Sequence, residues 1–186
     1  MNANEEFCSI VQLTIDRVRL LMAAEVDCVA DKAGGGGGGA PAAVGYVELK
    51  TSKAFASARD VETFERHKLL KFWLQSFLAG VPSVIVGFRD EAGVVKELKT
   101  YETKTIHRLV RGEGRDYWNP TACFNFGKLV LDFLLEQLTA YAAKGGTAKR
   151  FVMRFDPEQA AVQIRVDDSA QKADDEQPAA KRQRAE

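Results

Sequence analysis

The feature that most constrains this chain is an alternating pattern that places two acidic residues on one face of a predicted β-strand. Across residues 18–29 every even position is apolar, whereas the odd positions end in Glu25 and Asp27. Side chains two positions apart on a strand point to the same side, so these carboxylates are predicted to lie about 6.5–7 Å apart. The alternation therefore predicts a strand that carries paired acids.

A second strand, predicted over residues 44–52, presents Glu48 and Lys50 on one face with Leu49 between them. If the two strands are neighbours and their faces match, three carboxylates and one ammonium converge. Clustered carboxylates repel one another unless a cation neutralises them, and Mg²⁺ or Mn²⁺ prefers such oxygen ligands. A bound metal activates water near neutral pH and stabilises charge on a phosphoryl oxygen.

An Asp followed by Glu-x-Lys on the next strand is the minimal pattern of the D…(D/E)xK metal-dependent nucleases. In that interpretation Lys50 supplies a fixed positive charge for the attacking water or the phosphate. The same residues also fit a solvated strand face on which Glu48 and Lys50 form a cross-strand pair. The pattern alone leaves both interpretations open.

Composition narrows the class of protein without naming a partner. The chain has 186 residues, and its 26 basic residues balance 26 acidic ones, so an argument for nucleic-acid binding must come from local residues. No apolar run reaches the ~18 residues of a membrane span, so no membrane partner is expected. Three cysteines without a Cys-x-x-Cys motif indicate buried free thiols in a reducing compartment.

The other elements predict an α/β (α+β) fold with a mixed sheet flanked by helices, resembling the D…(D/E)xK nuclease core. At the start of the chain the pattern predicts a helix capped by Asn4 and running to residue 13, followed by a turn at 16–17. A helix over 61–79, capped by Asp60, is predicted to precede a strand over 81–88 that is buried on both faces and a returning strand over 94–101. A central core helix over 120–143 and a closing hairpin over 150–155 and 161–166 complete the prediction.

The connections are predicted to be flexible. Residues 33–41 contain six consecutive glycines but lack the Gly-Lys-Ser/Thr ending of a phosphate-binding loop, which favours a surface connection between two strands. One domain is expected over residues 1–166. The polar tail over 167–186 is expected to be disordered, and its basic run at 181–184 is a weak match to a nuclear import motif.

Several segments, taken in order, resemble the DXO decapping exoribonuclease family of eukaryotes. They are AEVDC at 24–28, YVELKTS at 46–52, FERHKLLKFWLQSFL at 64–78, GVPSVIVGFRD at 80–90 and NFG at 125–127. The resemblance covers roughly residues 4–166. It implies a Mg²⁺- or Mn²⁺-dependent hydrolase that acts on RNA 5′ ends: it releases pyrophosphate from triphosphate ends, removes incomplete or NAD caps, and degrades RNA from 5′ to 3′. A nuclear location is predicted, with the cytoplasm as a further one.

The resemblance also implies roles for the acidic triplets. Asp27 and Glu48 resemble direct metal ligands, and Glu25 resembles the acid that holds a metal-bound water. The backbone carbonyl of Leu49 resembles a further ligand. These implied roles agree with the metal chemistry expected from the paired acids.

Substrate contacts are predicted for the lysine of the triplet and for one helix face. Lys68, Lys71 and Gln75 share a stripe by i+3 and i+4 spacing, which is either a solvated face or the lining of an RNA cleft. The resemblance places Lys50 at the scissile phosphate and water, and Gln75 at the same phosphate region. Lys50, Gln75 and Lys71 are therefore predicted to bind substrate.

The family's upstream arginine motif and Gly-x-x-x-Glu motif have no counterpart in this sequence, which resembles the carboxyl-terminal half of such an enzyme. Without one carboxylate and one phosphate clamp, weaker metal binding and poorer positioning of RNA are expected. The alternative prediction is a catalytically inactive protein that binds RNA or a nuclear 5′–3′ exoribonuclease.

Overall fold

The computed structural model describes residues 7–30, 45–112, 114–148 and 150–167, which form two compact units that divide after Phe126. Each unit is considered by itself. The expected glycine-rich connection at 33–41 and the expected tail from residue 168 lie outside the described residues, as does the start of the helix expected after Asn4.

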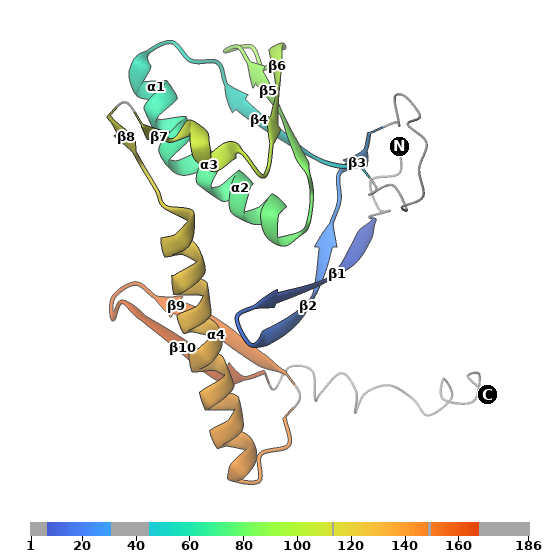
Figure 1. Ribbon diagram of the computed structural model, residues 1–186, viewed down its shortest axis with the longest axis vertical. Helices are drawn as coiled ribbons and strands as arrows, with labels where there is room; N and C mark the ends of the chain where they lie inside the picture. Colours follow the sequence, from blue (N-terminus) through green and yellow to red (C-terminus); the bar gives the residue numbers. More distant parts are fainter. Residues whose placement is uncertain (1–6, 31–44, 113, 149, 168–186) are drawn as a thin grey trace, which may run out of the picture. The chain divides into compact units, whose positions relative to one another are not determined.

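A mixed sheet with strand order β3-β4-β5-β6 forms the frame of the first unit (Figure 1). Its strands are β3 (Cys28–Val29), β4 (Tyr46–Lys53), β5 (Ser83–Arg89) and β6 (Val95–Glu102). β4 and β5 run parallel, whereas the two outer pairs are antiparallel. The predicted mixed sheet is therefore confirmed, and the apolar sequence of β5 matches its inner, largely buried position.

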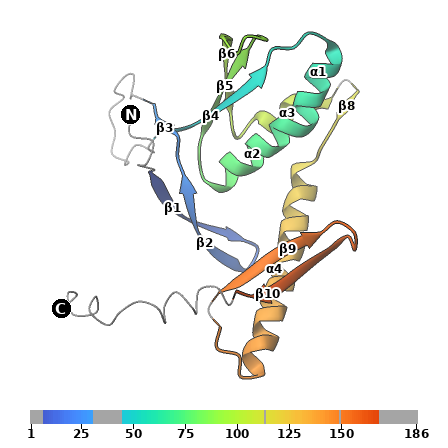
Figure 2. The same ribbon diagram turned by 180° about the vertical axis from the view of Figure 1, so that it is seen from behind.

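One helical run covers a face of this sheet in both views (Figures 1 and 2). It consists of α1 (Ala58–Thr63), a wider π-helical turn η1 (Phe64–Lys68) and α2 (Leu69–Leu78). The cap predicted at Asp60 is wrong: Ser57 is the N-cap, and its Oγ accepts a hydrogen bond from the Asp60 N–H at 3.3 Å. Asp60 closes the capping box instead, because its carboxylate accepts the Ser57 N–H at 2.9 Å.

The core of the first unit lies between this helical run and the sheet. Phe64 and Trp73 from the helices are buried, and the Phe64 ring lies 5.5 Å from that of Phe88 on β5. Trp73 also stacks at 5.0 Å on Trp118, from the connection that leads to the last helix. That connection contains the short elements α3 (Ile106–Leu109), β7 (Arg111–Gly112) and β8 (Arg115–Asp116).

The start of the described chain is a hairpin, not the predicted helix. β1 (Cys8–Ile15) pairs antiparallel with β2 (Val18–Glu25), around the predicted turn, where Asp16 has φ 53°. The β-branched residues Ile10, Val11, Thr14 and Ile15 favour a strand, and a partner of the same length follows directly. The single strand predicted over 18–29 is also wrong, because it is divided between β2 and β3.

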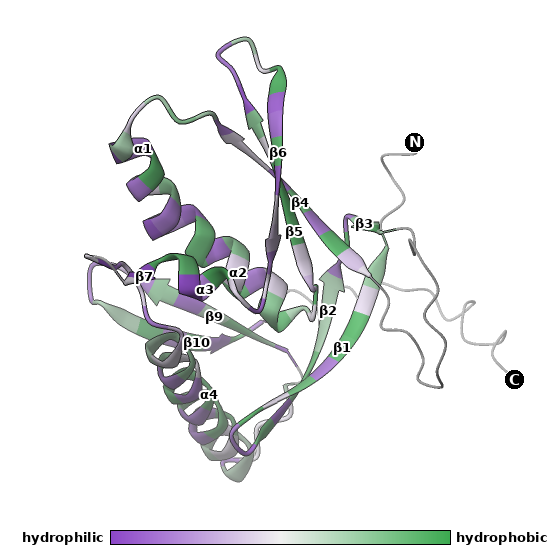
Figure 3. Ribbon diagram, turned by 45° about the horizontal axis from the view of Figure 1, so that its top comes forward, coloured by the Kyte–Doolittle hydropathy of each residue, from purple (hydrophilic) through white to green (hydrophobic). Residues whose placement is uncertain are grey.

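The second unit contains most of α4 (Pro120–Ala143) and the hairpin β9 (Phe151–Asp156) and β10 (Ala161–Val166), both as predicted. Asn119 caps α4 through its side-chain oxygen, which accepts the Thr121 N–H at 2.8 Å. The prediction that α4 is a core helix is wrong for the described chain, since none of its residues is buried. Figure 3 shows hydrophobic and hydrophilic residues interspersed around it.

All three cysteines are free, as expected, but Cys8 is exposed and the other two are only partly buried. The prediction that the thiols are buried is therefore wrong for Cys8, and Cys28 and Cys123 are buried only in part. None of the helices within the described ranges is long and apolar enough to cross a membrane.

The buried phenol of Tyr101 should make the protein less stable at alkaline pH. Burial, helped by the carboxylates of Glu65 and Glu97, raises the pKa of Tyr101 from its usual value near 10 to about 12. Its contribution to the free energy of unfolding is fully present below pH 10 and is lost as the pH rises toward 12, by roughly 2 kcal/mol. Denaturant unfolding of wild type and Tyr101→Phe between pH 8 and 12 measures this. Equal alkaline slopes for the two proteins would contradict it.

Candidate metal centre

The first acidic residue of the centre lies where β3 meets β4. Cys28 is paired with Val47, so continuing the antiparallel register places Asp27 opposite Glu48. The Asp27 carboxylate accepts a hydrogen bond from the backbone N–H of Leu49 at 2.7 Å. Asp27 is therefore fixed against β4 beside the Glu48-Leu49-Lys50 triplet.

The second acid, Glu48, is a buried carboxylate with two side-chain partners. It is 3% exposed, and its Oε1 accepts a hydrogen bond from the Gln75 amide of α2 at 2.7 Å. The Lys50 ammonium, two residues along the same strand face, forms an ion pair with the same oxygen. Lys50 also lies 5.8 Å from the centre of the Phe72 ring. A buried carboxylate is stable only with such partners.

The structure thus brings Asp27, Glu48, Lys50 and Gln75 together. It leaves Glu25 apart: this residue ends β2, is exposed, and pairs in register with Cys8 on β1. Lys71 is exposed on α2. Within the described ranges no group of three or more His, Cys, Asp or Glu side chains is arranged to hold a metal ion.

The convergence expected for three carboxylates is therefore a convergence of two in this geometry. The physical reason is that Glu25 still pairs with β1, whereas pairing with β4 begins only at Cys28. The change of partner between these two residues separates Glu25 from Asp27. A role for Glu25 at a metal-bound water stays a prediction.

A second contact between the helical run and β4 joins Lys68, a member of the predicted stripe, to Ser52. The Lys68 ammonium donates to the hydroxyl of Ser52 at 2.9 Å, and Ser52 is buried. The signal in the sequence is the matched spacing: Ser52 follows Glu48 by four strand residues, and Lys68 precedes Gln75 by seven helix residues. Both spacings keep a residue on the same face of its element.

The donors of this centre fit a hard divalent cation in kind. Two carboxylates and the backbone carbonyl of Leu49 are oxygen ligands, which Mg²⁺ and Mn²⁺ prefer. The buried Glu48 already attracts one cationic group, the Lys50 ammonium, to its carboxylate. Asp27 and Glu48 would hold the ion, with the predicted help of Leu49 and, through water, Glu25.

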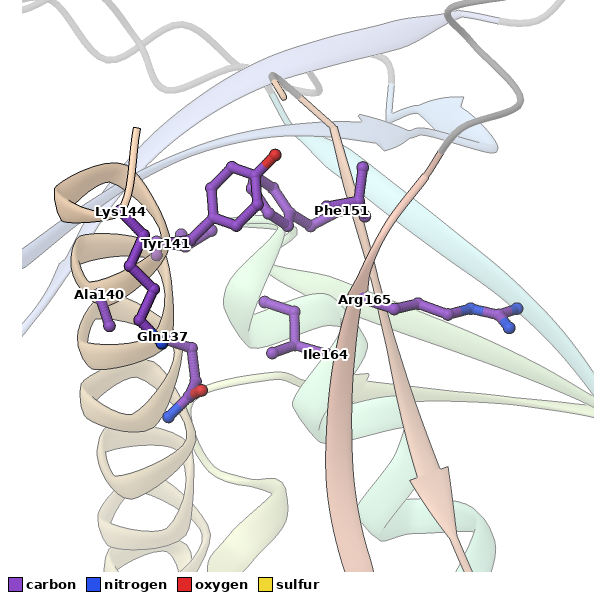
Figure 4. A pocket seen from close by; sticks show the side chains of 9 residues that line it. Gln137, Ala140, Tyr141, Lys144, Phe151, Ile164 and Arg165 are labelled. Carbon is purple, nitrogen blue, oxygen red and sulfur yellow. The ribbon is translucent and has the colours of Figure 1, made fainter. Parts of the chain in front are cut away.

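A separate cavity of about 280 Å³ in the second unit does not belong to this centre (Figure 4). It lies between the end of α4 and the β9–β10 hairpin, where the rings of Tyr141 and Phe151 meet edge to face at 5.3 Å. The side chain of Arg165 extends away from it. None of the predicted site residues lines this cavity.

A mixed sheet that places an Asp beside a Glu-x-Lys triplet, under a helix that contacts the triplet, is the arrangement predicted for a nuclease-type metal site. The family described as RAI1 like PD-(D/E)XK nuclease matches residues 1–182. The chain belongs to this family, which confirms the resemblance found in the sequence.

Relatives and solved structures agree with this assignment. The chain is 44% identical over 133 residues to the Homo sapiens decapping and exoribonuclease protein, covering 72% of this chain and 32% of that protein. It is 40% identical over 147 residues to the Emericella nidulans decapping nuclease RAI1, covering 79% and 39%. The crystal structure of Candida albicans Rai1 in complex with pU5-Mn²⁺ matches with a TM-score of 0.67 and 26% identity, over 92% of this chain and 44% of that one. The chain thus spans less than half the length of these proteins.

Removing the Lys50 ammonium should destabilise the protein, because Glu48 would stay buried without its cationic partner. We expect Lys50→Met to lower the free energy of unfolding by about 2–3 kcal/mol at pH 7, somewhat below a fully buried pair because Lys50 is partly exposed. Lys53→Met is the matched control on the same strand, because its ion pair with Glu91 is exposed and should contribute little. Urea unfolding measures both variants, and equal losses would contradict the prediction.

Proposed function

We propose that this chain carries the metal centre of an RNA 5′-end hydrolase that uses Mg²⁺ or Mn²⁺. The observation that carries the proposal is the meeting of Asp27 with the buried Glu48, which is held by Lys50 and Gln75. Membership of a nuclease family supports it, as do relatives named for decapping and exoribonuclease activity. The manganese ion and the pU5 in the Candida albicans complex support a divalent metal and an RNA substrate.

The side chains divide the work in a way that follows from their positions. Asp27 and Glu48 would hold the divalent ion, which would supply an activated water and stabilise charge on the phosphoryl oxygens. Gln75 orients the Glu48 carboxylate by its hydrogen bond, while Lys50 adds positive charge beside the scissile phosphate. Lys71, exposed on the same helix, contacts the substrate phosphate chain.

The proposed substrates are RNAs with faulty 5′ ends. They include 5′-triphosphate ends, from which pyrophosphate is released, and incomplete or NAD caps, which are removed whole. Digestion from 5′ to 3′ follows once the end is open. The proposed location is the nucleus, with the cytoplasm as a further site.

A second function is favoured by the small number of acids in the centre. The carboxylates of Asp27 and Glu48 meet, and no group of three or more metal-ligating side chains is found among the described residues. An incomplete centre of this kind suits a protein that binds RNA, or a nuclear 5′–3′ exoribonuclease, without turning substrate over.

Neutralising either ligand should abolish hydrolysis. We expect Asp27→Asn and Glu48→Gln to lower the rate of product release from 5′-triphosphate RNA and NAD-capped RNA in Mn²⁺ by at least about 100-fold. Glu91→Gln, which removes an exposed carboxylate near the end of β5, is the matched control and should leave the rate unchanged. Product release is followed by chromatography, with and without EDTA.

The two functions give different results in this experiment. Equal rates for wild type and both ligand variants would exclude catalysis through this centre. Absence of turnover in wild type, together with RNA or exoribonuclease capture that persists in Glu48→Ala, would establish the second function instead.

A further inference from the structure

We propose that Lys68, Ser52 and Phe55 form a second nucleotide subsite, which holds the RNA nucleotide that follows the scissile position. Lys68 and the Ser52 hydroxyl contact its phosphate, and the Phe55 ring stacks on its base. The inference deepens the proposed function, because it places the body of a single-stranded RNA along the seam between β4 and the helical run.

The charge of Lys68 is available to a phosphate, unlike the charges of Lys50 and Lys53 on β4. Lys50 is paired with Glu48 and Lys53 with Glu91, whereas Lys68 donates to the neutral hydroxyl of Ser52. An ammonium has three donors, so this contact leaves two for an incoming anion. The Lys68 ammonium therefore lies at an exposed position with donors left for an incoming anion.

A cavity of about 130 Å³ opens where this lysine lies. Ser52 and Lys68 are among its lining residues, as are the aromatic residues Phe55 and Phe64. Phe55 is 38% exposed although it packs edge-on against Phe64 at 5.2 Å and Phe88 at 4.9 Å. Its ring is thus held rigidly while part of it faces solvent, which suits stacking on a base.

One acidic residue, Asp60, also lines the cavity. The Asp60 carboxylate accepts hydrogen bonds from the backbone of Ala56 and from both the backbone and the hydroxyl of Ser57, at 2.9–3.0 Å. These contacts lower the pKa of Asp60 and orient its charge toward the start of α1. The Asp60 carboxylate is thus engaged at the start of α1, whereas the phosphate contacts are assigned to Ser52 and Lys68.

The spacing along β4 matches the step of an extended RNA strand. Ser52 follows Lys50 by two residues on the same face, a distance of about 6.5–7 Å, which is the kind of step that separates neighbouring phosphates in a stretched single strand. The π-helical turn η1 ends at Lys68 and begins at the buried Phe64. The first and last residues of this wider turn, Phe64 and Lys68, both line the cavity. Such turns are frequent at functional sites.

Fluorescence and calorimetric titrations of the full chain with RNA in Mn²⁺ test the subsite. The probes are a 5′-phosphorylated five-nucleotide oligouridylate with a phosphorothioate first linkage to slow hydrolysis, and uridine 5′-monophosphate. We expect Lys68→Met to reduce the salt dependence of oligonucleotide binding, the slope of log K against log[salt], by about 0.7. Phe55→Leu should weaken oligonucleotide binding roughly tenfold. Neither variant should change binding of the mononucleotide, which reaches only the metal centre.

Controls separate a binding role from a structural one. Lys68→Arg should restore the salt slope, and Lys104→Met, which removes an exposed lysine elsewhere, should keep it at the wild-type value. Thermal unfolding establishes that each variant is folded. Oligonucleotide binding that is unchanged in both test variants, or equal losses for the oligonucleotide and the mononucleotide, would overturn the subsite.

The outcome for the subsite is independent of the outcome for catalysis. If Asp27→Asn abolishes hydrolysis while Lys68→Met and Phe55→Leu bind the oligonucleotide like wild type, the proposed function stands and the subsite is overturned. If wild type does not hydrolyse RNA but its binding depends on Lys68 and Phe55, the subsite stands and the proposed function fails.

Discussion

The candidate site depends on a single buried carboxylate on an inner strand of the sheet. The Glu48 carboxylate contacts Lys50 on the same strand and Gln75 on the covering helix. These two contacts fix how α2 is aligned along β4. A charge at such depth is costly unless partners surround it. The polar pair therefore specifies how the helix lies on the sheet. Stability and site geometry are set by the same contact between layers.

The second constraint is the change of direction between β2 and β3. Strand pairing with β1 ends at Glu25, and pairing with β4 begins at Cys28, so Asp27 lies outside both ladders. A backbone free of ladder constraints can turn its carboxylate toward the Leu49 N–H, and this hydrogen bond takes the place of a ladder contact. The break that removes Glu25 from the centre is also what orients Asp27 in it.

Much of this was predictable from sequence because local chemistry and tertiary position agree. Strand and helix periods correctly placed Glu48 and Lys50 on one face of β4, and the apolar run matches the largely buried β5. Of the predicted stripe, Lys68 and Gln75 contact β4 and Lys71 is exposed, while their predicted contacts with RNA stay predictions. The predicted first helix failed because Asn4 and the following acids offered capping signals, while β-branched residues downstream found a strand partner. The break at Val26 could not be predicted, because the even-position alternation runs through it without interruption.

The face of the sheet away from the helices carries exposed apolar side chains behind the site. Leu49 is 49% exposed and Leu98 is 70% exposed, and both point away from the side that carries Glu48 and Lys50. The β1–β2 ladder has only two strands, a size that is marginal on its own. Within the described residues, these apolar side chains leave β4 without packing on that face. Packing against that face would hold β4 in place, so that ion binding at Asp27 and Glu48 would not have to order the strand.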